Sequence, residues 1–242
     1  MTDQMTEEPK ASPRGTPVGR RVVLGVVGLG AAGVLAGRWL SSGVSDVVAS
    51  TAPGLASIVP VAGGFRIYTV TGGYPEMPPA DYRLGVSGLV NEPMSLSLDD
   101  LAQLPQTQMT KDFQCVTGWR VEDVPWSGVL LRDVLDAAGV ESDAEALKLT
   151  SFDGAYTESL TVEQAMRDDM LVATSMYGGP IEVKHGAPVR LVAAPMYGYK
   201  SIKWMDGIEL TRTVIPGYWE VRGYDIDAWV GKSNGRTDEP VV

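Results

Sequence analysis

The octapeptide DFQCVTGW occupies residues 112–119 and contains Cys115, the only cysteine in the 242-residue chain. A single cysteine cannot form an intramolecular disulfide, which is the usual role of cysteine in an exported protein. One explanation is a buried, inert side chain, because free cysteine often packs as a small hydrophobic residue. The other is a ligand, because thiolate sulfur binds soft transition metals. The rest of the sequence bears on this choice.

The chain offers Cys115 few protein partners for a metal site. It has no C-x-x-C motif, and its single histidine, His185, lies far along the sequence. A zinc or haem site built only from protein ligands is therefore poorly supported. If Cys115 binds a metal, an organic cofactor must provide most of the coordination.

A group of cations lies in residues 185–204, HGAPVRLVAAPMYGYKSIKW. Its polar members are His185, Arg190, Lys200, Ser201 and Lys203. Arg190 falls in an apolar, strand-like run, where an unpaired charge would cost several kcal/mol, so it needs an anionic partner. The glycine turn YGYKS can present backbone N–H groups beside lysine and serine side chains, which suits a phosphate. Salt bridges to nearby carboxylates are the alternative explanation, and the lone histidine could be purely structural.

Charge and composition limit the function classes. The net charge is −10, and the first fifty residues are nearly balanced, so the acidic excess lies in the remainder. A body of that charge would repel a phosphate backbone, and nucleic-acid binding is therefore not expected. The 44% hydrophobic content suits a globular chain with one substantial core or two small ones.

The first fifty residues have the features of a targeting segment. The pair Arg20-Arg21 precedes an uncharged run at residues 22–37, as in a twin-arginine export signal. Sixteen helical residues span about 24 Å, less than the roughly 30 Å of a bilayer core. Extension to residue 40, with Arg38 snorkelling, would permit a retained anchor. We therefore predict export by the twin-arginine machinery to the periplasm or cell envelope, with a cytoplasmic protein as the alternative.

The remaining sequence predicts a linker at 51–64 and one folded domain at 65–242. The linker is rich in Ala, Pro, Gly and Ser and has no amphipathic period. Strands are predicted at 82–90, 147–152, 170–177, 187–195 and 207–212. Helices are predicted at 97–105, 126–140 and 161–166, the first two beginning at the caps Ser97 and Ser127, and the second ending at Gly139. Their irregular order predicts an α+β domain with mixed sheets and short helices.

Four segments in a fixed order carry a family resemblance: DFQCVTGW, VPWSGVLLRDVL, HGAPVRLVAAPMYGYKSIKW and GYWEVRGY. Together they resemble the molybdopterin-binding domain of the sulfite oxidase family. The exported bacterial members, such as catalytic subunits of periplasmic methionine sulfoxide reductases, are the most similar. The resemblance covers roughly residues 65–229 and implies that domain's fold.

The resemblance also implies a cofactor and its contacts. Cys115 would bind molybdenum, whose other ligands are oxo groups and the dithiolene sulfurs of one molybdopterin. Asp153 in SFDG would contact the pterin ring. The residues implied around the pterin and its phosphate are His185, Arg190, Lys200, Ser201 and Lys203.

Further residues are implied at the reacting face. Tyr224 matches a tyrosine beside the oxo groups of the metal, where its hydroxyl can donate a hydrogen bond or a proton. Arg120 aligns with an arginine that helps to bind sulfite, and Trp126 with a tryptophan that lines the pocket. Where the sulfite-oxidising members carry an arginine near the domain start, FRIYTV offers Tyr68 and Thr69, which we expect at the cofactor. This departure removes one clamp for a sulfite dianion.

The implied activity is oxygen-atom transfer to or from a small molecule. Molybdenum passes an oxygen atom as it cycles between its +6 and +4 states, and a thiolate ligand helps to set the potential. Reduction of an S-oxide or N-oxide is the favoured reaction, with electrons exchanged with a separate membrane haem or quinone-linked subunit. The alternatives are sulfite oxidation, a non-catalytic binding module that keeps the fold, and an envelope-associated structural domain.

Overall fold

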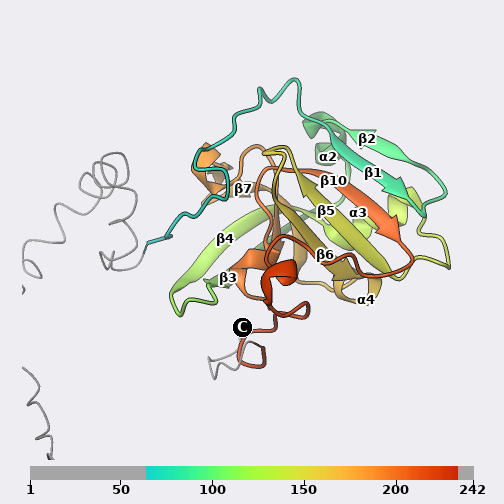
Figure 1. Cartoon of the computed structure of the whole chain (residues 1–242). Helices are drawn as coiled ribbons and strands as arrows, with labels where there is room; N and C mark the ends of the chain where they lie inside the picture. Colours follow the sequence, from blue (N-terminus) through green and yellow to red (C-terminus); the bar gives the residue numbers. More distant parts are fainter. Residues whose placement is uncertain (1–63, 234–242) are drawn as a thin grey trace, which may run out of the picture. The chain divides into compact units, whose positions relative to one another are not determined.

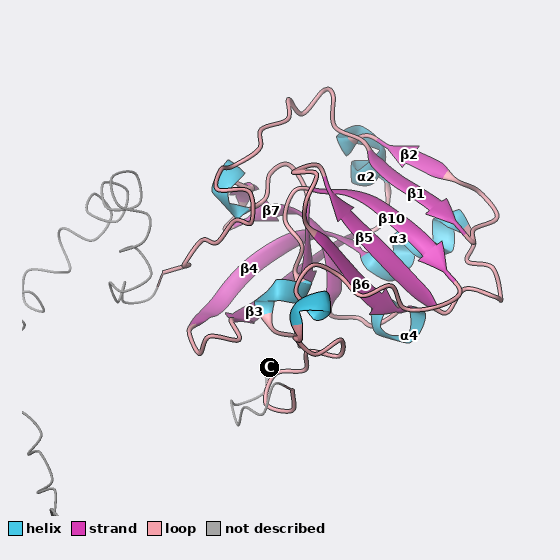
Figure 2. Ribbon diagram, viewed as in Figure 1, coloured by secondary structure: helices cyan, strands magenta, loops and turns pink. Residues whose placement is uncertain are grey.

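The computed structural model describes residues 64–233, which form two β-sheets with short helices packed around them (Figures 1 and 2). The predicted signal or anchor at 1–50 and nearly all of the predicted linker lie outside the described residues. Between residues 64 and 233, no helix has both the length and the apolar character needed to cross a bilayer. The prediction of mixed sheets with short helices is confirmed.

The first sheet contains the strands predicted at both ends of the domain. Its members are β1 (Leu84–Gly88), β2 (Met94–Leu96), β5 (Ala146–Ser151), β6 (Thr157–Thr161) and β10 (Met205–Thr211). They lie in the order β2-β1-β10-β5-β6. The β1–β10 pair is parallel and the other pairs are antiparallel, so the sheet brings the two ends of the domain together at its centre.

The second sheet is antiparallel and carries the cysteine hairpin. Its members are β3 (Gln106–Gln114), β4 (Arg120–Leu130), β7 (Met170–Met176), β8 (Gly179–Pro180) and β9 (Arg190–Ala193). Between β3 and β4 the chain reverses at residues 115–119. The Cys115 N–H donates to Trp119 O at 2.8 Å, and the Gly118 N–H donates to Cys115 O at 2.9 Å. Gly118 has φ 96°, a conformation that glycine adopts readily, so this turn sets the cysteine at the hairpin tip.

The helices are short, and the structure corrects one of them. They are α2 (Leu98–Gln103), α3 (Leu131–Ala138), α4 (Val162–Ala165) and the 3₁₀ turns η1 (Val183–His185), η2 (Gly198–Lys200) and η3 (Glu220–Arg222). Ser97 caps α2 as predicted, and α3 ends at Gly139 as predicted. The predicted start of that helix at Ser127 is wrong, because residues 120–130 pair with both β3 and β7. Pairing on two sides overrides the local helix signal.

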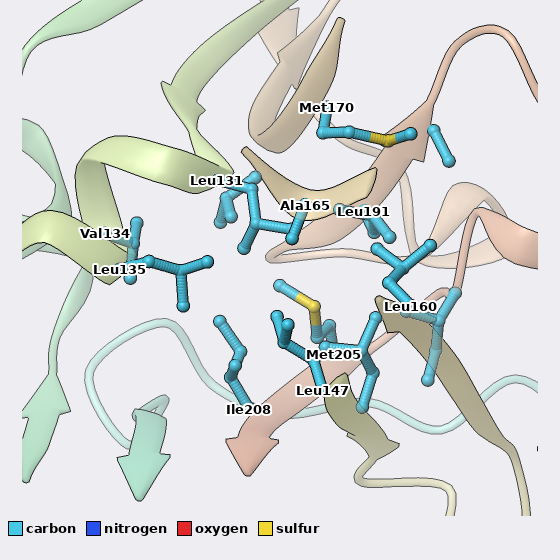
Figure 3. Packing of buried hydrophobic residues seen from close by; sticks show 14 of the residues in the cluster. Leu131, Val134, Leu135, Leu147, Leu160, Ala165, Met170, Leu191, Met205 and Ile208 are labelled. Atoms are coloured by element: carbon cyan, nitrogen blue, oxygen red, sulfur yellow. The ribbon is translucent and has the colours of Figure 1, made fainter. Parts of the chain in front are cut away.

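The main core lies between the first sheet, α3 and one face of the second sheet. Figure 3 shows residues from these elements converging on one interior, among them Leu135, Leu147 and Met170. On β9, Leu191 and Ala193 belong to this core, whereas Val192 belongs to the cluster on the other face. Because strand side chains alternate between faces, Arg190 shares the face of Val192. This register directs the buried arginine away from the main core.

Candidate functional site

A cavity of about 380 Å³ lies where the hairpin tip meets the irregular segments of the domain. Its walls come from residues 65–70, the hairpin tip, the loop after β5, and the segments that follow β9 and β10. Most of the residues singled out from the sequence line it. They are Tyr68, Thr69, Cys115, Asp153, His185, Arg190, Ser201, Lys203 and Tyr224.

Cys115 is half-buried in the cavity wall and belongs to neither buried apolar cluster. Its sulfur accepts a hydrogen bond from Thr117 Oγ1 at 3.3 Å. This position does not fit the explanation of an inert cysteine packed in the core. A sulfur that faces a cavity and accepts a hydroxyl hydrogen bond suits a thiolate ligand, because such outer contacts tune metal-bound groups.

Arg190 places a buried cation beside the cavity. The residue is 3% exposed, and its guanidinium donates to three backbone carbonyls: His185 O at 2.8 Å, Ser201 O at 2.9 Å and Leu191 O at 3.3 Å. The rings of Phe113 and Trp126 each lie 5.3 Å from its Cζ atom. Among residues 64–233, no carboxylate forms a salt bridge with it. Burial lowers the pKa of Arg190 to about 9, so the site would gain from an anion.

Lys203 provides a second cation in the lining. Its Nζ donates to Tyr68 O at 2.8 Å and lies 4.1 Å from the centre of the Trp204 ring. The pKa of Lys203 is lowered to about 7, chiefly by burial and next by repulsion from Arg190, with Asp153 opposing both. A bound anion would raise the pKa values of both cations and hold them charged.

His185 is uncharged at neutral pH. Burial lowers its pKa to about 4, with repulsion from Arg190 as the next cause. Its ring meets the ring of Phe65 edge-on, with centroids 5.0 Å apart. A neutral imidazole can donate or accept one hydrogen bond at each nitrogen, according to its tautomer.

Buried polar atoms without partners cluster in the cavity lining. Asp153 Oδ1 accepts from the N–H groups of Ala155 and Tyr156, at 2.9 and 2.8 Å, but its Oδ2 has no partner in the described part of the chain. The same holds for His185 Nδ1 and Trp119 Nε1. Such atoms are uncommon because burying them unpaired is costly. Together they offer an acceptor and donors that fit a polar heterocycle carrying an anionic group, which is the chemistry of molybdopterin.

Tyr224 lies in an aromatic corner of the cavity. Its ring centroid is 5.3 Å from that of Tyr199 and 5.1 Å from that of Trp219. Nothing within residues 64–233 forms a hydrogen bond with its hydroxyl group. The tyrosine therefore presents a donor from a position fixed by its ring contacts.

Three predicted residues lie outside the lining. The Arg120 guanidinium contacts Gln114 Oε1 at 2.6 Å and Asp112 Oδ2 at 3.4 Å. Trp126 is 2% exposed and lies behind two lining residues, Arg190 and Phe65. The Lys200 ammonium is fully buried between Glu158 and Glu220. Its charge is thus taken by carboxylates, which corrects the expectation that its side chain contacts a phosphate.

The structure also adds residues that sequence reasoning missed. Trp119, Tyr156, Tyr199 and Trp219 line the cavity, as does Arg66 in the segment before β1. Trp119 and Tyr199 lie inside motifs quoted above, so their motif membership was an available signal. Arg66 and Trp219 likewise lie in the quoted segments FRIYTV and GYWEVRGY, whereas Tyr156 carried no such signal.

Substitution of Asp153 by asparagine is expected to weaken cofactor retention by about 10-fold, because an unmade hydrogen bond to a buried group costs about 1–3 kcal/mol. Asparagine can still accept the two backbone N–H groups with its oxygen, but it then turns an amide N–H₂ toward the cavity. Pterin released on dilution, per folded chain, measures the effect. Asp143→Asn, at an exposed carboxylate paired with Arg212, is the matched control. Equal retention in the two variants would remove Asp153 from the binding site.

The chain is similar in sequence to a known domain family and to several named proteins. The profile of the oxidoreductase molybdopterin binding domain matches residues 71–219. The oxidoreductase YuiH of Bacillus subtilis is 37% identical over 150 residues, covering 61% of this chain and 75% of that protein. The protein-methionine-sulfoxide reductase catalytic subunit MsrP of Campylobacter jejuni is 31% identical over 156 residues, covering 58% of this chain and 52% of that subunit.

The same subunit from Xanthomonas campestris is 36% identical over 149 residues, covering 55% of this chain and 46% of its own length. The chain thus spans about half the length of these reductase subunits. Among solved structures, the sulfane dehydrogenase SoxCD of Paracoccus pantotrophus superposes with a TM-score of 0.55 and 24% identity. The superposition covers 63% of this chain and 46% of the SoxCD chain, and the similarity is one of fold.

Proposed function

Because the chain belongs to the oxidoreductase molybdopterin-binding domain family, we propose that it reduces an S-oxide or N-oxide by oxygen-atom transfer at a cofactor bound in the cavity. The observation that carries this proposal is the meeting of two unusual groups in one lining. The only cysteine of the chain and a buried arginine without a carboxylate partner among residues 64–233 face the same space.

Different residues of the cavity lining bind different parts of the cofactor. Cys115 supplies a sulfur ligand to molybdenum. Arg190, Lys203 and Ser201 hold the anionic tail of the pterin, and Asp153 and His185 meet its polar edges. When bound, the cofactor supplies the two-electron redox change that oxygen-atom transfer requires. The protein contributes position, charge and exclusion of water.

The chemistry of the lining favours a neutral, weakly polar substrate. Phe65, Trp119 and Trp219 give the cavity aromatic walls, which suit a thioether or its S-oxide. Tyr224 offers a hydroxyl that can donate to the oxygen of such a substrate. The names of the reductase relatives support an S-oxide in particular.

One observation favours a second candidate, sulfite oxidation. Arg66 lines the cavity and brings a third cation to it, two residues before the position where Tyr68 and Thr69 replace the expected arginine. A sulfite dianion would be attracted by this cation. The relative rates with the two substrate classes separate the candidates.

The full chain, produced in a host that makes molybdopterin, is expected to contain about one molybdenum and one pterin per folded protein. After reduction, dimethyl sulfoxide or methionine sulfoxide should reoxidise it. Sulfite should reduce the oxidised form at least about 10-fold more slowly than either S-oxide reoxidises the reduced form, because a lost hydrogen bond between charged groups costs about 1.5–3 kcal/mol. Metal analysis and stopped-flow absorbance measure both. Folded protein without molybdenum would contradict the proposal, and rapid reduction by sulfite would instead support sulfite oxidation.

The cellular setting is part of the proposal. Electrons would come from a separate membrane haem or quinone-linked subunit, and residues 1–50 would direct export through the twin-arginine machinery to the periplasm or cell envelope. Export of a folded protein suits a cofactor inserted before translocation. Fractionation of cells that express the full chain tests the location.

A further inference from the structure

A buried group of ionisable residues lies directly behind the cavity wall. Lys200, on η2, is fully buried; its Nζ lies 3.0 Å from Glu158 Oε2 and also contacts Glu220 Oε1. Glu158, on β6, is fully buried, and Glu220, on η3, is 7% exposed. Two carboxylates thus share one ammonium group. With every group ionised, the cluster would hold an uncompensated negative charge away from water, which is strongly unfavourable.

The hydrogen bonds show which carboxylate is charged. Glu220 Oε2 accepts from Ser159 Oγ at 2.7 Å and from the Gly217 N–H, while its Oε1 faces Lys200. These donors satisfy both oxygens of an ionised group. Glu158 Oε2 faces Lys200 and the Ser159 N–H, but its Oε1 faces only the hydroxyl of Tyr156, at 3.3 Å.

The hydroxyl of Tyr156 has a single proton, and that proton has a better acceptor. It is donated to Tyr199 O at 2.6 Å. The Tyr156 oxygen can therefore meet Glu158 Oε1 only as an acceptor, which requires a proton on Glu158. Tyr156 also lines the cavity, so this residue links Glu158 to the reaction space.

We propose that Glu158 is a protonated carboxylic acid in the resting protein and delivers its proton through the Tyr156 hydroxyl to the reaction in the cavity. The delivery rests on the proposed function, whereas the protonation of Glu158 does not. Reduction of an S-oxide consumes two electrons and two protons and releases a thioether and water. Glu158 supplies one proton, solvent supplies the other, and the electrons come from the reduced cofactor.

The transfer is balanced at each atom. The Tyr156 O–H first turns from Tyr199 O toward the cavity. The Glu158 Oε1–H bond then breaks as a bond forms to the Tyr156 oxygen, while the original Tyr156 O–H bond breaks and its proton passes to the substrate oxygen. Glu158 is left as a carboxylate that shares Lys200 with the charged Glu220, an unfavourable state that reprotonation of Glu158 from solvent relieves. The two proton movements occur together, because burial raises the pKa of Tyr156 well above its ordinary value and disfavours a tyrosinate.

The surroundings of Glu158 support this protonation state. Lys200 faces it from η2, Glu220 from η3, and Tyr156 from the loop before β6. The pKa of Glu158 is raised to about 8, chiefly by burial; Lys200 opposes this rise and repulsion from Glu220 contributes to it. The acid form therefore predominates at neutral pH and is lost as the pH rises through about 8.

Infrared spectroscopy of the full chain tests the protonation state without any substrate. Wild-type protein, with or without cofactor, should show the carbonyl stretch of a buried carboxylic acid, which disappears with a midpoint near pH 8. Glu158→Gln should remove this band, since the amide can donate to Tyr156 in the same way. Glu209→Gln, an exposed matched control, should keep it. Absence of the band in wild-type protein overturns the proposal.

Kinetics test the delivery. Glu158→Gln should lower kcat at least about 10-fold at unchanged KM, since a positioned proton donor contributes about 10²–10⁴-fold and solvent replaces it in part. It should also abolish the fall of kcat through pH 8. Tyr156→Phe should do the same while retaining the carboxylic-acid band, and it serves alone if Glu158→Gln does not fold. If both variants keep the kcat and the pH profile of the wild-type protein, the proposed proton delivery is overturned. If the wild-type protein is inactive with every substrate, only the proposed function is contradicted.

Discussion

Substitution of Cys115 by serine is expected to reduce turnover by more than about 100-fold, because loss of a direct ligand should exceed the 10–100-fold effect typical of outer contacts. Serine preserves the size of the side chain but replaces a soft sulfur by a hard oxygen, which binds molybdenum less well. The fold should be unaffected, because Cys115 lies at a hairpin tip outside both apolar clusters. Turnover with an S-oxide and the sulfur-to-metal absorption of the loaded protein measure the effect.

Thr117→Val provides the matched control for this site. It removes the hydroxyl that donates to the sulfur at 3.3 Å and leaves the sulfur in place. A smaller loss, within the 10–100-fold range, is expected. A thiol reagent adds a second readout, since it should modify Cys115 in cofactor-free protein and fail to do so in loaded protein. Unchanged turnover in Cys115→Ser, or equal thiol reactivity in the two forms, would show that the sulfur does not bind the metal.

Substitution of Arg190 by glutamine is expected to weaken cofactor binding by about 30-fold or more. Removing one partner of a buried, hydrogen-bonded charge pair costs about 2–5 kcal/mol, and 2 kcal/mol corresponds to about 30-fold. Arg190→Lys should be intermediate, because lysine keeps the charge but cannot donate to His185 O, Ser201 O and Leu191 O together. Pterin and molybdenum per folded chain, after dialysis, report the loss.

A thermal measurement separates binding from folding in these variants. Arg190 also supports the backbone, so its loss lowers the Tm of cofactor-free protein. The increase in Tm on cofactor loading reports binding alone, and it should shrink in Arg190→Gln. Arg212→Gln, at an exposed ion pair with Asp143, should keep the full increase. An undiminished increase in Arg190→Gln would exclude a role for this arginine in holding the anion.

The elements that could be predicted from the sequence are those with a local signal. Apolar runs bounded by turn residues predicted β1, β5, β7, β9 and β10, and the Ser97 cap predicted the start of α2. The resemblance to the sulfite oxidase family is confirmed by the family match over residues 71–219. Strand β4 was missed because it has no such local signal. Its run at 120–130 is a strand because of two partners that are distant in sequence.

The same distinction explains the site. Cys115 and the 185–204 segment could be predicted as site residues from their residue types alone, and the structure brings both to one cavity. The Glu158 and Glu220 partners of Lys200 come from distant segments, so no spacing predicts them. Lys200 and Ser201 are adjacent, yet a 3₁₀ turn of three residues rotates successive side chains by about 120°. One therefore enters the carboxylate cluster while the other lines the cavity.

The segment that precedes β1 bears on how the protein should be expressed. Residues 65–70 form one wall of the cavity, but the family match begins at residue 71. A shortened gene designed on that match would encode β1 to β10 and still omit residues 65–70 at one wall of the cavity and Tyr224 at another. Truncation series should therefore keep Phe65 and the residues after it, and affinity tags are better attached farther upstream.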